Sequence, residues 1–525
     1  MRKRLPTLMV ALFAATAVAA PPLSAQPGGG AALMWSTDDP VLQQIYNEAM
    51  ENSHLERLGM QLLDSIGPRL TGSPGINRAH DWAARTLQGW GYEARNEQYG
   101  TWRAWDRGHT HIDLVAPRLR SLEGTILAWS PGTGGQDVQG PVIVVPEWET
   151  DADFQRWLST EVAGKFVAIS FPQPTCRPNR HFEEFGSSGA LQRLNEARGE
   201  ALQAFRQRVP APGLLRGQLE EAGALGILES NWSNTSGTNK VFSTNTRDIP
   251  TLDLSCEDYG LVYRLAEHGM GPVVRVNAAS EDLGEQPVFN TLGMIRGSEL
   301  PDEYVMLSAH FDSWDAGSGA TDNGTGSILM METMRILSEV YPNPRRSILI
   351  GLWGGEEQGL NGSRRFVAMN PDIVENIQAL FNQDNGTGRV ENISMQGFVD
   401  AGEHFGRWLA RIPPQITNQI NLQLPGTPGT GGTDHAAFVC APAAAFNLGA
   451  NSWGYGTYTW HTNRDTFDKL VFEDLRNNAA LVAMLVYQAS QDPERVSTAQ
   501  RVLRNPDGSV REWPTCQPGR TSSSN

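Results

Sequence analysis

The sequence predicts an α/β protein with a mostly parallel mixed sheet, helices on both faces, and a smaller α/β domain inserted into it. From residue 289 onward, apolar strand-like runs alternate with helical patterns, as in a doubly covered parallel sheet. The chain has 525 residues, of which 40% are hydrophobic, so it can build more than one buried core. The 54 glycines and 32 prolines favour a loop-rich fold over a helical bundle.

The first 25 residues resemble a secretory signal peptide. A basic start, Met1 to Arg4, precedes an apolar stretch over residues 5–20 and a small-residue cleavage site at residues 23–25. The apolar stretch is too short and too rich in alanine for a comfortable membrane span. We therefore expect a secreted or periplasmic protein with no membrane contact after cleavage, with an uncleaved anchor as the alternative.

Residues 34–120 are predicted to form the first part of the larger domain. Helical patterns begin at Asp39-Pro40 and continue at residues 53–66 and 77–88. Residues 67–73 form a turn, and residues 92–99 are predicted to be a strand.

Residues 121–283 are predicted to form the inserted domain, because this segment carries few candidate catalytic groups. The expected strands cover residues 142–145, 164–170, 224–228 and 249–254, and the expected helices cover residues 189–209, 216–222 and 257–267.

Residues 284–500 return to the larger domain. The expected strands cover residues 289–295, 304–309, 347–352, 379–382 and 444–448, and a strong helix covers residues 473–489. Residues 501–525 are a polar tail.

The four cysteines allow two disulfides in an oxidising compartment, and no CxxC motif indicates a cysteine zinc site. We expect Cys176–Cys256 and Cys440–Cys516, because each pair would lie within one predicted domain; buried free thiols are the alternative. The net charge of -16 argues against a nucleic-acid partner, which would require a basic patch.

Histidine and carboxylate side chains follow three strands of the larger domain. His310 follows the strand at 304–309, Glu356 and Glu357 follow the strand at 347–352, and Asp384 follows the strand at 379–382. Ligand sites in open α/β sheets form at the carboxyl ends of strands, so these groups should meet. Imidazole and carboxylate donors suit zinc. Asp322, in a glycine-rich turn before a helix, is well placed to bridge two zinc ions.

The order of these motifs resembles the di-zinc aminopeptidase and glutamate carboxypeptidase superfamily. His-x-Asp at 310–312 is followed by Asp-Asn at 322–323, Glu-Glu at 356–357, Asp384 and a late histidine motif at 458–466. The chain looks most like the carboxypeptidase Q branch (plasma glutamate carboxypeptidase) and related bacterial secreted peptidases. Residues 67–73 resemble the N-terminal segment of that branch, and residues 121–283 resemble its protease-associated domain.

The resemblance implies a role for each matching residue. His310 and Asp384 would hold one Zn²⁺, Glu357 and His461 would hold the second, and Asp322 would bridge them. Glu356 would be the general base that activates water between the two metals. Asp312 would assist catalysis by accepting a hydrogen bond from the far nitrogen of His310, and Asp465 would act similarly near His461.

Four residues are weaker candidates for substrate contact. His435 lines the substrate pocket or is a structural loop histidine, Arg464 neighbours the late histidine, and Tyr458 donates to an oxyanion or simply packs, as does Tyr455. The resemblance also implies a cis peptide between Asp322 and Asn323.

The implied activity is hydrolysis of dipeptides or short peptides by a zinc exopeptidase. The sequence leaves open whether the enzyme is a dipeptidase, a carboxypeptidase or an aminopeptidase that releases N-terminal residues, because one metal site serves all three. An inactive binding or receptor protein on the same scaffold is the alternative of another class. The protease-associated domain would cover the cleft and limit substrate length, or serve as a spacer or homodimer contact.

Overall fold

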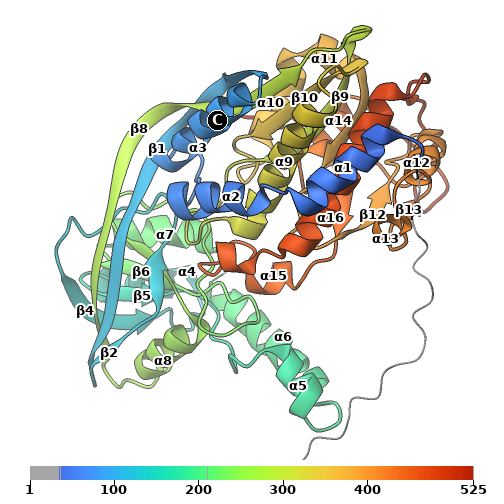
Figure 1. Cartoon of the computed structure of the whole chain (residues 1–525). Coiled ribbons are helices and arrows are strands. Elements are labelled where there is room, and N and C mark those ends of the chain that lie inside the picture. The colour runs from blue at the N-terminus through green and yellow to red at the C-terminus, as the bar shows by residue number, and fades with distance from the viewer. Residues whose placement is uncertain (1–34, 36, 210, 524–525) are drawn as a thin grey trace, which may run out of the picture. The chain divides into compact units, whose positions relative to one another are not determined.

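Two long antiparallel strands, β1 (Glu93–Ala116) and β8 (Val273–Ile295), form a curved ribbon in the computed structural model (Figure 1). The structure describes residue 35 and residues 37–209 and 211–523, so the predicted signal peptide lies outside the described residues. No helix within those ranges is long and apolar enough to cross a membrane.

The ribbon strands are much longer than the predicted segments at 92–99 and 289–295. Register shifts interrupt the β1–β8 ladder near Gly100 and between Arg107 and Thr110. Bulges of this kind let a strand continue where its apolar alternation breaks down. The sequence pattern therefore showed only the most regular end of each strand.

The main sheet is mixed and mostly parallel, as predicted. Its strand order from the edge inward is β13, β12, β14, β11, β9, β10 and β8. The neighbours β14, β11, β9 and β10 run parallel, and β12 runs parallel to β13, whereas β8 is antiparallel to β10 and β12 is antiparallel to β14. The strands are β9 (Leu300–His310), β10 (Arg346–Trp353), β11 (Ile377–Asn382), β12 (Val390–Ser394), β13 (Asn421–Gln423) and β14 (Ala445–Ala450).

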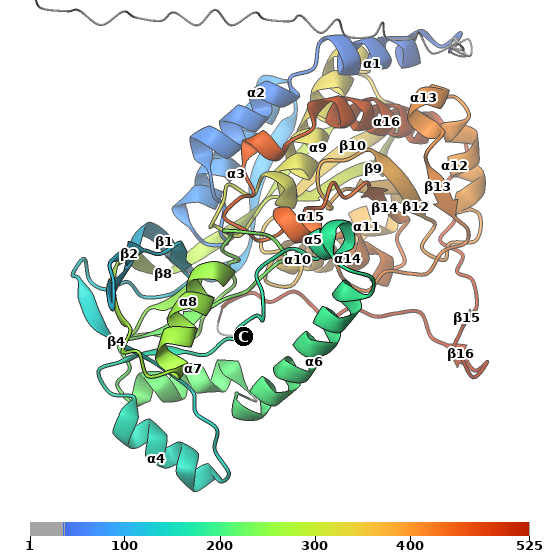
Figure 2. The ribbon, with the colours of Figure 1, turned by 90° about the horizontal axis from the view of Figure 1, so that it is seen from below.

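Helices cover both faces of this sheet (Figure 2). On one face lie α9 (Thr325–Val340) and α16 (Phe472–Gln491), with α1 (Pro40–Glu51) packed outside them. On the other face, α10 (Asn361–Met369) and α14 (His435–Cys440) place Phe366 and Phe438 against Trp353. The three aromatic side chains are buried, which anchors α10 directly behind the carboxyl end of β10.

A smaller sheet continues from the far end of the ribbon. Its order is β4, β5, β6, β7 and β3, and β4 pairs with β8. The strands are β3 (Gly124–Ile126), β4 (Val138–Val144), β5 (Phe166–Ala168), β6 (Gly226–Glu229) and β7 (Thr251–Leu254); the helices are α4 (Asp151–Glu161), α5 (Asn179–Phe185), α6 (Ala190–Arg208), α7 (Pro212–Glu221) and α8 (Cys256–Glu267). The predicted boundary at residue 284 falls inside β8, because that strand serves both sheets.

The remaining short elements connect these layers. They are α2 (Leu55–Gly59), η1 (Met60–Ile66), α3 (Pro74–Gly89), β2 (Arg120–Ser121), η2 (Ala320–Gly324), α11 (Pro371–Glu375), α12 (Ala401–Leu409), α13 (Pro414–Thr417), α15 (Tyr455–Tyr458), η3 (Phe467–Lys469), β15 (Leu503–Arg504) and β16 (Val510–Arg511). The helix predicted over 53–66 is divided, because its second half has π-helical geometry and ends at Gly67, which has a φ of 85°.

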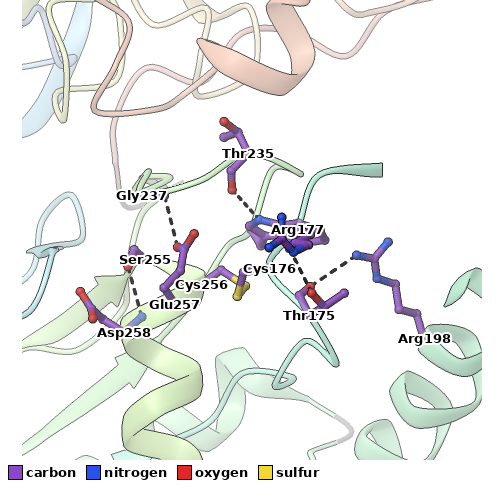
Figure 3. Close-up of a disulfide and its surroundings, with 11 residues drawn as sticks. Thr175, Cys176, Arg177, Arg198, Thr235, Gly237, Ser255, Cys256, Glu257 and Asp258 are labelled. Atoms are coloured by element: carbon purple, nitrogen blue, oxygen red, sulfur yellow. Dashed lines mark hydrogen bonds between the residues drawn. A yellow bond between two sulfur atoms is a disulfide. The ribbon is translucent and has the colours of Figure 1, made fainter. Parts of the chain in front are cut away.

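Both predicted disulfides are present. Cys176–Cys256 ties the segment before α5 to the start of α8 (Figure 3). Cys440–Cys516 ties the C-terminal tail to the end of α14. Beyond this bond the tail crosses the molecule: the Thr101 amide donates to the Thr521 carbonyl at 2.8 Å, and the Arg520 amide donates to Asn361 Oδ1 at 2.9 Å. The polar tail is therefore part of the folded structure.

Candidate metal centre

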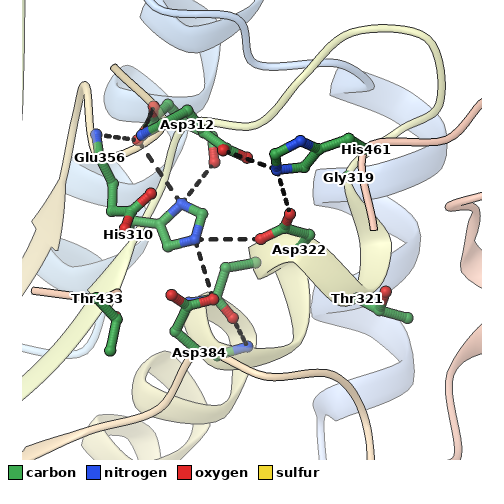
Figure 4. Close-up of polar contacts among 12 residues, drawn as sticks. His310, Asp312, Gly319, Thr321, Asp322, Glu356, Asp384, Thr433 and His461 are labelled. Atoms are coloured by element: carbon green, nitrogen blue, oxygen red, sulfur yellow. Dashed lines mark hydrogen bonds and ion pairs between the residues drawn. The ribbon is translucent and has the colours of Figure 1, made fainter. Parts of the chain in front are cut away.

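The metal-ligand candidates meet at the carboxyl ends of the parallel strands. His310 is the last residue of β9, Glu356 and Glu357 follow β10, and Asp384 follows β11. Asp322 comes from η2, which precedes α9, and His461 comes from the segment after α15. Short loops after adjacent strands thus bring distant parts of the sequence together, and Figure 4 shows the resulting cluster.

Asp322 lies between two groups of donor atoms. His310 Nε2 is 3.4 Å from Asp322 Oδ1 and 3.2 Å from Asp384 Oδ1. His461 Nε2 is 3.3 Å from Asp322 Oδ2 and 3.1 Å from Glu357 Oε2. Each of the two oxygens of Asp322 therefore faces a different histidine and a different second carboxylate, and each group could hold one metal ion.

The chemistry of these donors fits zinc. Within the described chain, Glu357 Oε1 is buried without a hydrogen-bond partner, and the buried Asp322 Oδ2 has only the His461 imidazole nearby, at 3.3 Å, without hydrogen-bond geometry. A buried carboxylate oxygen without a partner is costly unless a cation completes its environment. Burial, reinforced by the nearby Asp322, raises the pKa of Glu357 to about 7. Burial also opposes charge on His461, but the carboxylates of Asp322 and Glu357 outweigh it and raise the pKa of that imidazole to about 9.

Glu356 lies beside the metal-ligand candidates and lines the same cavity as Asp322, Glu357, Asp384 and His461. Burial raises the pKa of its carboxyl well above the ordinary value, and Asp384 adds to this, whereas His310 opposes it. A carboxyl group with a raised pKa is suited to accept a proton and release it again near neutral pH. Its position and its environment both fit the role predicted for a general base.

Asp312 supports this site in a different way from the one expected. His310 Nδ1 is 3.0 Å from the main-chain carbonyl of Asp312 and 3.7 Å from its carboxylate. The carboxylate instead accepts hydrogen bonds from the amides of Glu356 at 3.1 Å and Glu357 at 3.2 Å, and from the Thr71 hydroxyl at 3.1 Å. Asp312 thus orients both glutamates as well as His310.

Asp465 holds the turn that carries Asp322. Its carboxylate accepts hydrogen bonds from the amides of Thr321 at 2.8 Å and Asp322 at 3.1 Å. The expected contact with His461 is not formed, because within the described residues His461 Nδ1 has no hydrogen-bond partner. The Asp322–Asn323 peptide is cis, as predicted from the resemblance.

Arg69 is a supporting residue that the sequence did not reveal. The buried guanidinium donates to the carbonyls of Phe311 at 2.7 Å, Ser318 at 2.7 Å, Gly319 at 2.9 Å and Gly67 at 3.1 Å. These carbonyls belong mostly to the segment that connects His310 with Asp322. The sequence predicts a turn over residues 67–73 that resembles a family segment, but no local pattern indicates which of its residues faces the site.

The weaker substrate candidates His435, Tyr458 and Arg464 do not line the cavity that is lined by the metal-ligand candidates. Tyr458 and Arg464 line a neighbouring cavity of about 520 Å³, and Arg464 also approaches Glu123 at 3.5 Å. His435 is buried, and burial lowers the pKa of its imidazole to about 4. Tyr455 lines both cavities and therefore joins them.

The cavity beside the metal-ligand candidates has a volume of about 410 Å³. Its wall includes residues that sequence reasoning did not select: Gly359, Leu360, Arg364, Gly431, Gly432 and Trp460. The Trp460 ring packs against the His461 ring with centroids 3.9 Å apart and ring planes tilted by 32°. A loop of the smaller sheet region covers the other side, because the Val241 amide donates to the His461 carbonyl at 2.9 Å and Phe242 contacts the His461 ring at 5.0 Å.

Comparisons with known proteins agree with this arrangement. The family model of peptidase family M28 matches residues 290–486. Carboxypeptidase Q from Homo sapiens is 27% identical over 383 residues, covering 73% of this chain and 75% of the relative. Carboxypeptidase Q from Rattus norvegicus is 25% identical over 454 residues, covering 86% and 88%.

Solved structures share the fold. A peptidase M28 precursor from Shewanella amazonensis SB2B has a TM-score of 0.63 at 22% identity, covering 87% of this chain and 98% of the other. BSAP, a zinc aminopeptidase from Bacillus subtilis, has a TM-score of 0.53 at 18% identity, covering 85% and 97%.

Proposed function

Because this chain carries a peptidase family M28 domain and is a metallo-exopeptidase, we propose that it hydrolyses dipeptides or short peptides with two zinc ions. The observation that carries this proposal is the position of Asp322, whose two carboxylate oxygens face two separate histidine–carboxylate pairs. One shared carboxylate between two such pairs is the donor arrangement that a two-metal hydrolase needs.

In this proposal His310 and Asp384 would hold one zinc ion, Glu357 and His461 would hold the other, and Asp322 would contribute to both sites. Zinc at these positions would supply Lewis acidity that lowers the pKa of water to about 7 and polarises the peptide carbonyl. His310 reaches Asp384 and Asp322 through Nε2, while the Asp312 carbonyl at Nδ1 fixes the ring orientation.

Glu356 carries out the proton transfers. Its carboxylate takes a proton from the attacking water, which adds to the scissile carbonyl carbon, and then gives that proton to the leaving amine. The amide of Glu356 is fixed by Asp312, so the base is oriented before substrate arrives. Neither a serine nor a cysteine nucleophile takes part in this mechanism.

We also propose that residues 121–283 act as a protease-associated domain that covers the cleft. The amide of Asn463 donates to the Asn239 carbonyl at 3.0 Å, and Arg180 of α5 lies 5.9 Å from the Tyr458 ring. These contacts support a cover that admits short peptides and excludes folded chains. The basic and apolar N-terminal sequence supports export, and mass analysis of the mature N-terminus tests it.

The experiment that tests the activity is product analysis with zinc-loaded enzyme and three matched substrates: a free dipeptide, its N-acetylated form and its C-amidated form. Hydrolysis of the free form alone indicates a dipeptidase. Hydrolysis that tolerates the acetyl group but requires the carboxylate indicates a carboxypeptidase. Hydrolysis of the free and amidated forms indicates an aminopeptidase.

Glu356→Gln provides the matched control, because it removes the base and leaves the proposed ligands in place. This variant should still bind zinc, but it should cleave each of the three substrates far more slowly than the natural sequence does. If the natural sequence binds zinc and cleaves none of them, the exopeptidase proposal fails and an inactive binding scaffold becomes the better explanation.

A further inference from the structure

Arg364 introduces a positive charge into an otherwise acidic cavity. It lies on α10, seven residues after Glu357, and lines the cavity of about 410 Å³ beside the metal ligands. The same cavity is lined by Asp322, Glu356, Glu357 and Asp384. Arg364 is the only lysine or arginine that the described residues contribute to this wall.

Within residues 37–209 and 211–523, Arg364 forms no ion pair, and its Nε is buried without a hydrogen-bond partner. The buried arginines Arg69 and Arg335 use their donors fully, since Arg69 donates to four carbonyls and Arg335 pairs with Glu332. Arg365 also has a buried Nε without a partner, so what distinguishes Arg364 from its neighbour is its place on the cavity wall. A guanidinium is always charged and presents a fork of donors that matches a carboxylate. Its unused donors therefore need an explanation, and the cavity that it faces offers one.

Other cations near the site are less suitable. Lys240 Nζ lies 4.1 Å from the centre of the Trp460 ring, and Lys240 does not line the cavity. Arg464 lines the neighbouring cavity and approaches Glu123. Arg365, next to Arg364 on the same helix, lies outside the cavity wall.

We propose that Arg364 is the specificity residue that binds a carboxylate of the peptide substrate, from either its C-terminus or an acidic side chain. This inference rests on the proposed peptidase function, and it names what the substrate must carry. Two parallel N–H···O bonds to the guanidinium would hold the substrate carboxylate away from the acidic ligands, with the scissile carbonyl directed toward Glu356.

The test uses Arg364→Gln, with Arg365→Gln as the matched control and Arg364→Lys as the conservative variant. Two substrate pairs separate the carboxylate sources: Ala-Ala against Ala-Ala-amide for the C-terminus, and Ala-Glu-amide against Ala-Gln-amide for the side chain. Arg364→Gln should reduce kcat/KM for the carboxylate member of one pair by about 10- to 100-fold, mainly through KM, and change its neutral partner less than about twofold.

Arg364→Lys should recover part of the loss, because it keeps the charge but not the fork. Arg365→Gln should leave both pairs unchanged. Thermal melting and zinc content confirm that each variant is folded and loaded. If Arg364→Gln lowers kcat/KM for the carboxylate member of only one pair, that pair identifies the source of the carboxylate. If the folded variant prefers the carboxylate member over its neutral partner as strongly as the natural enzyme does in both pairs, the proposal is overturned.

A binding measurement separates this proposal from the peptidase function. Calorimetry compares Ala-Ala, Ala-Ala-amide, Ala-Glu-amide and Ala-Gln-amide on zinc-loaded Glu356→Gln, with and without Arg364→Gln. The second substitution should weaken binding of a carboxylate member by about 10- to 100-fold. If the natural enzyme cleaves no substrate, the proposed peptidase function fails, but these dissociation constants still test the role of Arg364. If each carboxylate peptide binds equally tightly with and without Arg364→Gln, the proposed role of Arg364 is wrong.

Discussion

The Asp312 carboxylate accepts a hydrogen bond from the main-chain amide of Glu356 at 3.1 Å. The sequence suggested that this carboxylate would serve His310. In the structure it fixes the segment that carries the proposed base and the neighbouring metal-ligand candidate, so one residue links the end of β9 to the loop after β10.

Asp312→Asn should therefore impair both metal binding and catalysis. In asparagine an NH₂ group replaces one of the two carboxylate oxygens that now accept from the main-chain N–H groups of Glu356 and Glu357. Because NH₂ cannot accept a hydrogen bond, at least one of these bonds is lost. We expect both kcat/KM and zinc affinity to fall, by about 10- to 100-fold. Asp64→Asn, on the exposed surface, is the control and should change neither value. Full activity and full zinc affinity in Asp312→Asn would contradict the role given to this carboxylate.

Arg69→Lys tests the connection beneath the metal centre. Lysine keeps the charge but cannot reach four carbonyls with one ammonium group, so buried carbonyls lose their donors. We expect the free energy of unfolding to fall by about 3 kcal/mol, since each lost buried hydrogen bond costs about 1 to 3 kcal/mol. Urea unfolding measures this change. Exposed Arg78→Lys is the matched control, and equal stability of the two variants would contradict the prediction.

The pH dependence of stability should reflect His80. This residue is buried against Phe311, and Nδ1 lies 2.8 Å from the Thr291 hydroxyl. Burial lowers the pKa of the imidazole from 6.5 to about 3, although the Asp312 charge opposes this. Because the folded pKa is depressed, the neutral ring contributes fully above pH 6.5, and this contribution is lost as the pH falls from 6.5 toward 3.

Between pH 7.5 and pH 5, protonation of His80 in the unfolded chain should cost about 2 kcal/mol of stability. His80→Gln should lose less stability over that interval, whereas exposed His111→Gln should behave like the natural sequence. Urea unfolding at both pH values measures the difference. The same pH dependence in all three proteins would show that His80 does not titrate as described.

The Cys440–Cys516 disulfide should stabilise the C-terminal tail and, through it, the loop after Glu357. Replacing both cysteines by serine opens a loop closed across 76 residues and should lower stability by about 2 to 4 kcal/mol. The tail contacts from Arg520 to Gln358 and Asn361 would weaken, so kcat/KM should also decrease. Thermal melting and steady-state kinetics measure the two effects; an unchanged melting temperature would refute the first.

The sequence predicted the metal-ligand candidates better than the residues that support them. His310, Glu356, Glu357 and Asp384 each follow an apolar run, so a general rule about strand ends was enough to group them. Arg69 and Arg364 gave no such signal, because their importance depends on which carbonyls or cavity walls lie nearby after folding.

The long ribbon was also beyond the reach of sequence patterns. β1 and β8 stabilise each other through a ladder between segments roughly 180 residues apart, and bulges interrupt the alternation that identifies a strand. The disulfides were easier to expect, because four cysteines allow few pairings.

The most direct test of the central claim is the position of zinc in crystals of the zinc-loaded protein. Anomalous difference maps at the zinc absorption edge should show two peaks, one beside His310 and Asp384 and one beside Glu357 and His461, with Asp322 between them. A single peak, or peaks away from Asp322, would contradict the two-metal account.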